Sequence, residues 1–218
     1  MKVSNEEIDL LPLCQYDQEI ALIDKAEDIE AAVAEMSQHP ALGFDTETRP
    51  AFTRGCNYKV ALLQLSAEHK TWLIRLCKTG MTEALAHFLE NKEIVKPGLA
   101  IRDDLRGLRK LRDFTPGGFI DMQSIAEAKG VEDLSLKKMA AHVLGVRVSK
   151  RQRLTNWEGE TLTPGQLTYA ATDSWVSLQL YKALSAGVTD SERVADVRRQ
   201  LESQRAMEAD DKAQTQNK

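Results

Sequence analysis

Cysteine is scarce in this sequence. Only Cys14, Cys56 and Cys77 occur among 218 residues, an odd number without the paired spacing of a disulfide framework or a zinc site. This excludes a small secreted scaffold held together by disulfides, and reduced thiols in a cytoplasm are the simplest interpretation.

Long apolar runs are also missing. No segment approaches the roughly 20 apolar residues that cross a bilayer. Residues 1–18 carry acids and lack the basic start and apolar run of a secretory signal. We therefore expect a cytoplasmic protein that does not bind a membrane. With 42% hydrophobic residues, the chain can still fill the core of one sizeable domain.

The chain also lacks an excess of positive charge. The formal net charge is −4, which argues against general binding of polyanions. Basic residues nevertheless gather in two short stretches, namely Arg102, Arg106, Arg109, Lys110 and Arg112, and then Arg147, Lys150, Arg151 and Arg153. These stretches could be solvated faces of helices or loops, or they could contact phosphates.

Hydrophobic periodicity predicts a chain of mixed strands and helices. Strands are expected near 19–24, 41–47, 59–66, 70–76 and 94–100, and helices at 25–38, 81–90, 102–111, 121–129, 134–144 and 164–185. Strands gathered early and mixed with helices favour an α/β fold. We divide the chain into an N-terminal extension (1–18), the main domain (19–188) and a polar C-terminal helix that ends in a disordered tail (189–218).

Two acids follow an apolar run at the end of a predicted strand. Asp45 and Glu47 are two residues apart, so their side chains project from the same face. Carboxylates arranged in this way can bind a divalent cation, because hard cations prefer oxygen ligands. An ordinary exposed strand end is the alternative for this pattern.

A third acid lies inside the longest helical pattern. Asp173 is surrounded by apolar positions, and burying a carboxylate there is costly without a cation or a donor. Tyr169 lies four residues earlier, on the same helix face. Its phenol could position a water molecule beside the acid. A Tyr–Asp pair at a helix surface is the alternative.

Asp103 and Asp104 open the basic helix that is predicted at 102–111. Acids at this end favour the helix dipole, which is the simplest role for either residue. Asp104 shares a face with Leu108 and Leu111 and should turn inward, whereas Asp103 should face solvent.

Taken in order, these segments resemble the DEDD 3′-5′ exonucleases of the tyrosine subclass, and especially the ribonuclease D and Werner-syndrome-type exonuclease domains. The resemblance covers about residues 20–185. Its three blocks are ALGFDTETRPAFTRGCNYKVALLQLS, KPGLAIRDDL and LSLKKMAAHVLGVRVSKRQRLTNWEGETLTPGQLTYAATDSW. The Werner-type branch is favoured by Thr53-Arg54-Gly55, followed by Lys59-Val60-Ala61-Leu62 and Gln64-Leu65.

The resemblance implies a ribonuclease-H-like fold, with a mixed five-stranded sheet flanked by helices. It implies two divalent cations, Mg²⁺ or Mn²⁺, that are held by Asp45, Glu47, Asp104 and Asp173. Asp45 would bridge the cations, and Tyr169 would orient the attacking water. The implied reaction removes nucleoside 5′-monophosphates from the 3′ end of DNA or RNA.

The basic residues near these blocks are candidate contacts to the substrate, namely Arg102, Arg106, Lys150, Arg151 and Arg153. Trp157 could approach the substrate with them or pack in the core. Two other functions stay open at this point. One is a domain of the same fold that binds nucleic acid without cutting it, and the other is a general metal phosphoesterase. The sequence does not distinguish an RNA substrate from a DNA substrate, and it does not show the oligomeric state.

Overall fold

The computed structural model of the chain describes residues 2–53 and 57–216. Arg54, Gly55 and Cys56, which belong to the first block of the resemblance, lie outside the described residues. Cys14 and Cys77 are free thiols, as the sequence predicts for these two.

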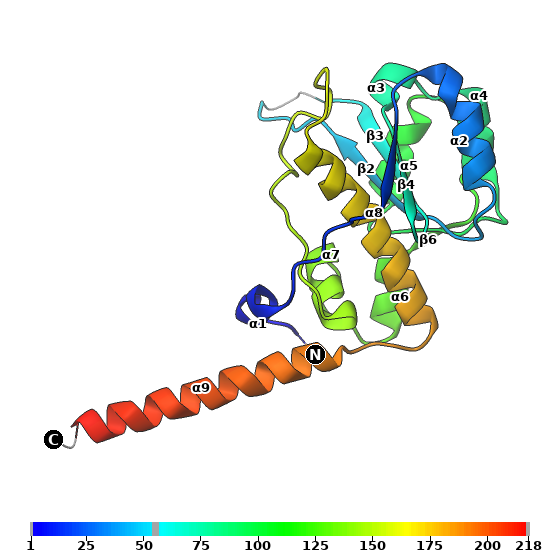
Figure 1. Cartoon of the computed structure of the whole chain (residues 1–218). Helices are drawn as coiled ribbons and strands as arrows, with labels where there is room; N and C mark the ends of the chain where they lie inside the picture. The colour runs from blue at the N-terminus through cyan, green and yellow to red at the C-terminus, as the bar shows by residue number, and fades with distance from the viewer. Residues whose placement is uncertain (1, 54–56, 217–218) are drawn as a thin grey trace.

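The main sheet has four strands in the order β1-β4-β3-β2 (Figure 1). β1 (Glu19–Ile23) pairs parallel with β4 (Lys70–Ile74). β4 pairs antiparallel with β3 (Val60–Ser66), and β3 pairs antiparallel with β2 (Gly43–Thr48). The sheet is therefore mixed, and its strands lie where the apolar runs predicted them.

The expected fifth strand belongs to a separate ladder, which corrects the prediction of a five-stranded sheet. β5 (Lys96–Gly98) pairs parallel with β6 (Phe119–Asp121). β5 also lies beside β2, but only one isolated bridge, between Ala41 and Val95, links the two ladders. Pro97 has no N–H group to donate, which helps to explain why the pairing stops after Val95.

The helix α8 (Pro164–Ser185) covers one face of the sheet (Figure 1). A capping box starts it: the Thr163 side chain accepts from the Gln166 N–H, and the Gln166 side chain accepts from the Thr163 N–H. The helix approaches β2 very closely at Gly43. A Cβ atom there would lie 1.9 Å from the Ser174 carbonyl oxygen. This close approach decides which α8 side chains face β2.

The opposite face of the sheet is covered by α2 (Ile29–Met36), α4 (Glu83–Glu90) and α5 (Arg102–Arg109). These helices enclose the largest hydrophobic cluster, which includes Phe44, Leu63, Leu65, Trp72, Leu85 and Leu108. Two short helical segments complete this side, the 3-10 turn η1 (Ala26–Asp28) and α3 (Leu76–Thr79).

A second cluster lies on α8 away from the main sheet. It holds α6 (Met122–Ala128), α7 (Leu136–Met139) and a π-helical turn, η2 (Ala140–Leu144). The helix predicted over 134–144 thus changes its hydrogen-bond register after Met139.

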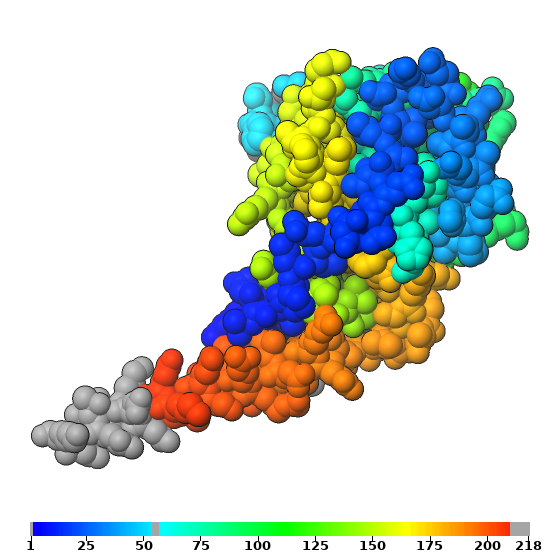
Figure 2. Space-filling view, viewed as in Figure 1, coloured from blue at the N-terminus to red at the C-terminus, as the bar shows by residue number. Residues whose placement is uncertain are grey.

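The two ends of the chain meet in the structure. α1 (Asn5–Leu10) packs against the first part of α9 (Glu192–Gln216), and α9 then projects away from the body (Figures 1 and 2). No helix within residues 2–53 and 57–216 is long and apolar enough to cross a membrane.

Candidate active site

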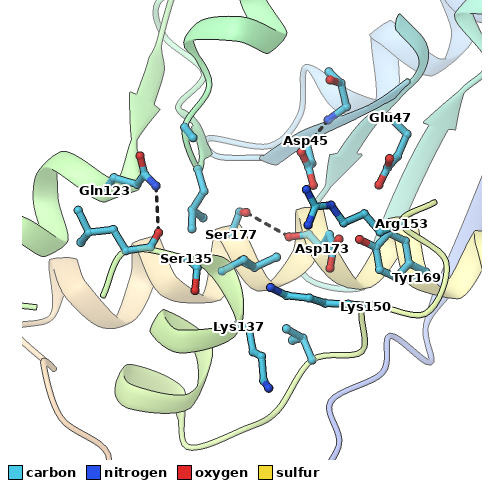
Figure 3. A pocket seen from close by; sticks show the side chains of 16 residues that line it. Asp45, Glu47, Gln123, Ser135, Lys137, Lys150, Arg153, Tyr169, Asp173 and Ser177 are labelled. Atoms are coloured by element: carbon cyan, nitrogen blue, oxygen red, sulfur yellow. Dashed lines mark hydrogen bonds between the residues drawn. The ribbon is translucent and has the colours of Figure 1, made fainter. Parts of the chain in front are cut away.

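Asp45 and Glu47 project from β2 toward α8. The alternation of the strand places both on one face, and Figure 3 shows their carboxylates facing the same space. They line a cavity of about 390 Å³ together with Tyr169 and Asp173 of α8. The two pairs are more than 120 positions apart in the sequence, and the packing of α8 on β2 brings them together.

Asp173 is 6% exposed and lies in the middle of α8. Burial raises its pKa to about 7, which a hydrogen bond from the Tyr169 hydroxyl and the charge of Lys150 partly oppose. Burial and the neighbouring acids raise the pKa of the Tyr169 phenol far above its ordinary value. Tyr169 therefore stays protonated near neutral pH and can donate a hydrogen bond.

The carboxylates on β2 are also difficult to ionise. Burial raises the pKa of Glu47 to about 9, with further contributions from the charges of Asp45, Asp173 and Asp104. The pKa of Asp45 is raised well above its ordinary value, first by burial and then by Asp173 and Asp104. Several buried acids at this spacing cannot all be charged at neutral pH unless positive charge compensates them.

Asp104 approaches the same acids from α5. The Thr46 hydroxyl donates a hydrogen bond to its carboxylate. Thr46 alternates with Asp45 and Glu47 on β2, so its side chain leaves the strand on the other face. Asp104 thus lies next to the acidic cavity without lining it, although its charge raises the pKa of both β2 acids.

The predicted orientation of α5 is confirmed. Asp104 is half-buried, and Leu108 is fully buried on the same face. Asp103 is exposed and forms an ion pair with Arg106 at 2.9 Å. The structure therefore favours Asp104 over Asp103 as the acid nearest to the site.

The candidate basic residues separate into three locations. Lys150 and Arg153 line the acidic cavity, where their charges lower the pKa of Asp173 and Glu47 respectively (Figure 3). Arg151 lines another hollow, which touches the other side of Tyr169. Arg102 and Arg106 are exposed on α5.

Trp157 packs in the core. It is completely buried in the cluster that includes Leu62, Leu73 and Ala170, with its ring 6.0 Å from that of Tyr169. The role near the substrate that was left open for Trp157 is therefore not supported by its position.

Part of the cavity wall is formed by residues that no sequence motif singles out. Gln123, Ser135 and Ser177 line it, and Figure 3 shows them on the side away from Glu47. Ala100 also lines it, with a positive φ of 53° that is unusual for alanine. The Asp121 carboxylate accepts a hydrogen bond from the Ala100 N–H at 3.1 Å. No residue pattern predicts this bend, since alanine does not favour a positive φ.

The donor set suits hard cations. In the described part of the chain, no three Asp, Glu, His or Cys side chains stand close enough together to hold a metal ion as they are placed. The acids nevertheless present only oxygen ligands, and burial raises their pKa values although Lys150 and Arg153 supply part of the compensating charge. A divalent cation would supply the rest of that charge, so the residues fit one.

Comparisons with known proteins point to an exonuclease family. Residues 20–189 match the family model described as 3′-5′ exonuclease. The chain is 31% identical over 186 residues to the bifunctional 3′-5′ exonuclease/ATP-dependent helicase WRN of Mus musculus, covering 81% of this chain and 13% of that protein. It is 30% identical over 185 residues to ribonuclease D of Haemophilus influenzae, covering 83% of this chain and 45% of that protein.

A solved structure shows the same fold. The RNase D of Escherichia coli, an exoribonuclease involved in structured RNA processing, matches with a TM-score of 0.70 and 25% identity over 78% of this chain and 45% of that one. The chain spans less than half the length of each of these three relatives. The match to the family model extends over most of the sequence, and the chain therefore belongs to the 3′-5′ exonuclease family.

Proposed function

We propose that the chain is a metal-dependent exonuclease that hydrolyses nucleic acid from the 3′ end and releases nucleoside 5′-monophosphates. The observation that carries the proposal is the cavity in which Asp45, Glu47 and Asp173 face one another beside Tyr169, with Lys150 and Arg153 at its wall. Residues 19–188 form the proposed catalytic domain, and a cytoplasmic location remains part of the proposal.

Two divalent cations, Mg²⁺ or Mn²⁺, would be held by Asp45, Glu47, Asp104 and Asp173. Bound there, such ions stabilise the attacking and leaving oxygens of an in-line displacement. The set is supported by the mutual charge effects of these acids on their pKa values. For Asp104, binding requires its carboxylate to turn from Thr46 toward the cavity.

The remaining residues act on the substrate and the water. Tyr169 keeps its proton and can hold the attacking water by a hydrogen bond. Lys150 and Arg153 are exposed at the cavity and can bind the phosphates on either side of the scissile bond. Phosphate contacts of this kind position a strand without reading its sequence.

The names of the three relatives mention RNA and leave DNA open. Two of the three are named ribonuclease D, and the one from Escherichia coli is described as an exoribonuclease, whereas the third combines a 3′-5′ exonuclease with a helicase. We propose a nucleic-acid 3′ end as the substrate and leave DNA and RNA as the two arms of the test. A domain that binds nucleic acid without cutting it is not favoured, because the chain keeps all four acids that the resemblance implies as metal ligands.

The test uses DNA and RNA strands of one sequence, labelled at the 5′ end, with Mn²⁺ or with a chelator. The expected result is shortening by one nucleotide at a time that needs the metal and stops when the 3′-hydroxyl is blocked. An Asp173→Asn protein should bind the strands and leave them intact. Binding without cleavage by the wild type would support the non-catalytic alternative, and cuts in a circular strand would show an endonuclease.

A further inference from the structure

Gln64 is a buried polar residue that the proposed mechanism does not use. It lies in β3 and is completely inaccessible to solvent. Its carboxamide nitrogen and oxygen both lack a hydrogen-bond partner. Among the described residues, the other buried side-chain atoms without a partner are single N–H groups, on Arg75 and Trp157, so Gln64 is the one side chain that leaves both a donor and an acceptor unpaired. Burying an amide in this way is costly, and packing alone does not explain an amide at this position.

The register of the sheet places Gln64 beside a catalytic acid. Gln64 is paired directly with Asp45 of β2 on one side and with Leu73 of β4 on the other. Directly paired residues of antiparallel strands project on the same face, with Cβ atoms about 4.5–5.5 Å apart. Asp45 is therefore its polar neighbour within the sheet.

The helix α8 packs over the face of β3 that carries Gln64. Ser66 lies two residues after Gln64 on the same face of β3, and its hydroxyl is 2.6 Å from that of Ser174 on α8. On the other side of Gln64, Leu62 packs with Ala170 of the same helix. The Gln64 carboxamide is thus enclosed between the sheet and the helix turn that carries Asp173.

Asp45 has room for a second donor. Its Oδ1 atom accepts the Thr46 N–H at 2.8 Å, whereas a carboxylate offers about four acceptor positions. We propose that Gln64 is a positioning residue: its carboxamide, which has no partner in the structure, would donate an N–H to the Asp45 carboxylate once that acid binds the cation, and would so set the orientation of the acid. This inference rests on the proposed function, because it requires Asp45 to be a metal ligand.

The chemistry of an amide suits this role. A lysine or arginine at this position would bring a positive charge that competes with the cation for Asp45, and an acid would add to the repulsion among the carboxylates. An amide donates a hydrogen bond without changing the charge. Partners that orient metal ligands in this way typically contribute 10- to 100-fold to metal affinity.

The test measures metal binding directly. Mn²⁺ is titrated by calorimetry into the wild type and into three variants: Gln64→Met, which keeps the size without a donor, Gln64→Asn, whose shorter amide does not reach, and Ser66→Ala as a control on the same strand face. We expect roughly tenfold weaker Mn²⁺ binding or more in both Gln64 variants and wild-type affinity in Ser66→Ala. The thermal midpoint of the metal-free Gln64→Met protein should not fall, because no hydrogen bond is lost there.

Repeating the Gln64→Met substitution in an Asp45→Asn protein distinguishes a positioning role of Gln64 from a structural one. In an Asp45→Asn protein, Gln64→Met should cause no further loss of Mn²⁺ affinity, because the group that Gln64 orients is gone. A wild type that binds Mn²⁺ and a Gln64→Asn variant that binds it equally well would overturn the inference and leave the exonuclease proposal intact. A wild type that binds no Mn²⁺ would instead overturn the proposed function. If the Gln64→Met protein fails to fold, the Mn²⁺ affinity of the Gln64→Asn protein tests the inference.

Discussion

The helices α8 and α5 each bring one acid to the site, but in different ways. α8 is packed so closely on β2 that the backbone at Gly43 and Ser174 leaves no space for a Cβ atom, and Asp173 is buried in this contact. α5 is exposed and basic along one side, and its Asp104 is half-buried with a hydrogen bond to Thr46. The first acid is held in place by the fold, and the second has an alternative partner.

The difference has a physical consequence. A carboxylate fixed in a buried contact keeps its place whether or not a cation compensates its charge, so it costs stability in the metal-free protein. A carboxylate that can turn to a neighbouring hydroxyl avoids part of that cost. We therefore expect changes at the α8 contact to affect folding and catalysis together, and a change of Asp104 on α5 to affect catalysis with little effect on folding.

The largest expected effect is at the contact between α8 and β2. Gly43→Ala should lower the free energy of unfolding by about 3 kcal/mol or prevent folding, because the added Cβ atom meets backbone that cannot move aside. Urea unfolding measures this. Gly165→Ala, in the first turn of the same helix, is the control, since the nearest neighbour of its Cβ atom is the flexible Gln152 side chain at 3.1 Å and no backbone atom lies among its contacts. Equal stability of both variants would contradict the rigid contact.

The second prediction concerns the pH dependence of stability in the chelated protein. Burial raises the pKa of Asp173 from 3.8 to about 7. The folded state therefore holds this proton more tightly than the unfolded state, so Asp173 by itself lowers the stability by at most about 4 kcal/mol as the pH rises from about 4 to about 7. Asp173→Asn should reduce this loss and abolish cleavage.

Unfolding at several pH values, with and without Mn²⁺, measures this loss. Added Mn²⁺ should restore the stability of the wild type at pH 7 and have less effect on Asp173→Asn. The exposed Asp103→Asn variant should follow the wild-type profile. A flat profile for the chelated wild type would show that Asp173 is compensated by a group of the protein itself.

The third prediction tests the acid on α5. Asp104→Asn should reduce cleavage by about 100-fold or more, as expected for the loss of a preorganised charged group, with little change in stability. Asp103→Asn should cost on the order of 0.3–1 kcal/mol of stability through the helix dipole and leave cleavage intact. Single-turnover cleavage of a labelled strand measures both. An active Asp104→Asn and an inactive Asp103→Asn would reverse the assignment.

The smallest expected effect is in the bend that leads into α5. Ala100→Gly should raise the stability by about 0.5–1 kcal/mol, because glycine adopts a φ of 53° without the strain of a Cβ atom. Differential scanning calorimetry should show a small rise in the thermal midpoint. Ala34→Gly, at an exposed position within α2, is the matched control and should lower it by a similar amount. A fall in both variants would mean that the bend is not strained.

Much of the fold could be predicted because its elements follow local rules. The strands β1, β3 and β4 lie within two residues of the predicted ranges, and Thr82 and Thr163 cap their helices as short polar side chains do. The short elements α1, α3 and β6 were missed, since three to six residues carry too little periodicity to be recognised. The strand predicted at 94–100 is present as β5, but its place in a five-stranded sheet was wrong, because pairing across a sheet edge is not encoded locally.

By itself, the sequence determined which way the candidate site residues point from their own elements. A period of two places Asp45 and Glu47 on one face of a strand, and a spacing of four places Tyr169 and Asp173 on one side of a helix. Only the tertiary structure decided how far apart these faces lie and what else is enclosed between them. Gly43 brings α8 onto β2, Thr46 holds Asp104 and Gln64 is enclosed beside Asp45, because each contact joins residues that are distant in the sequence.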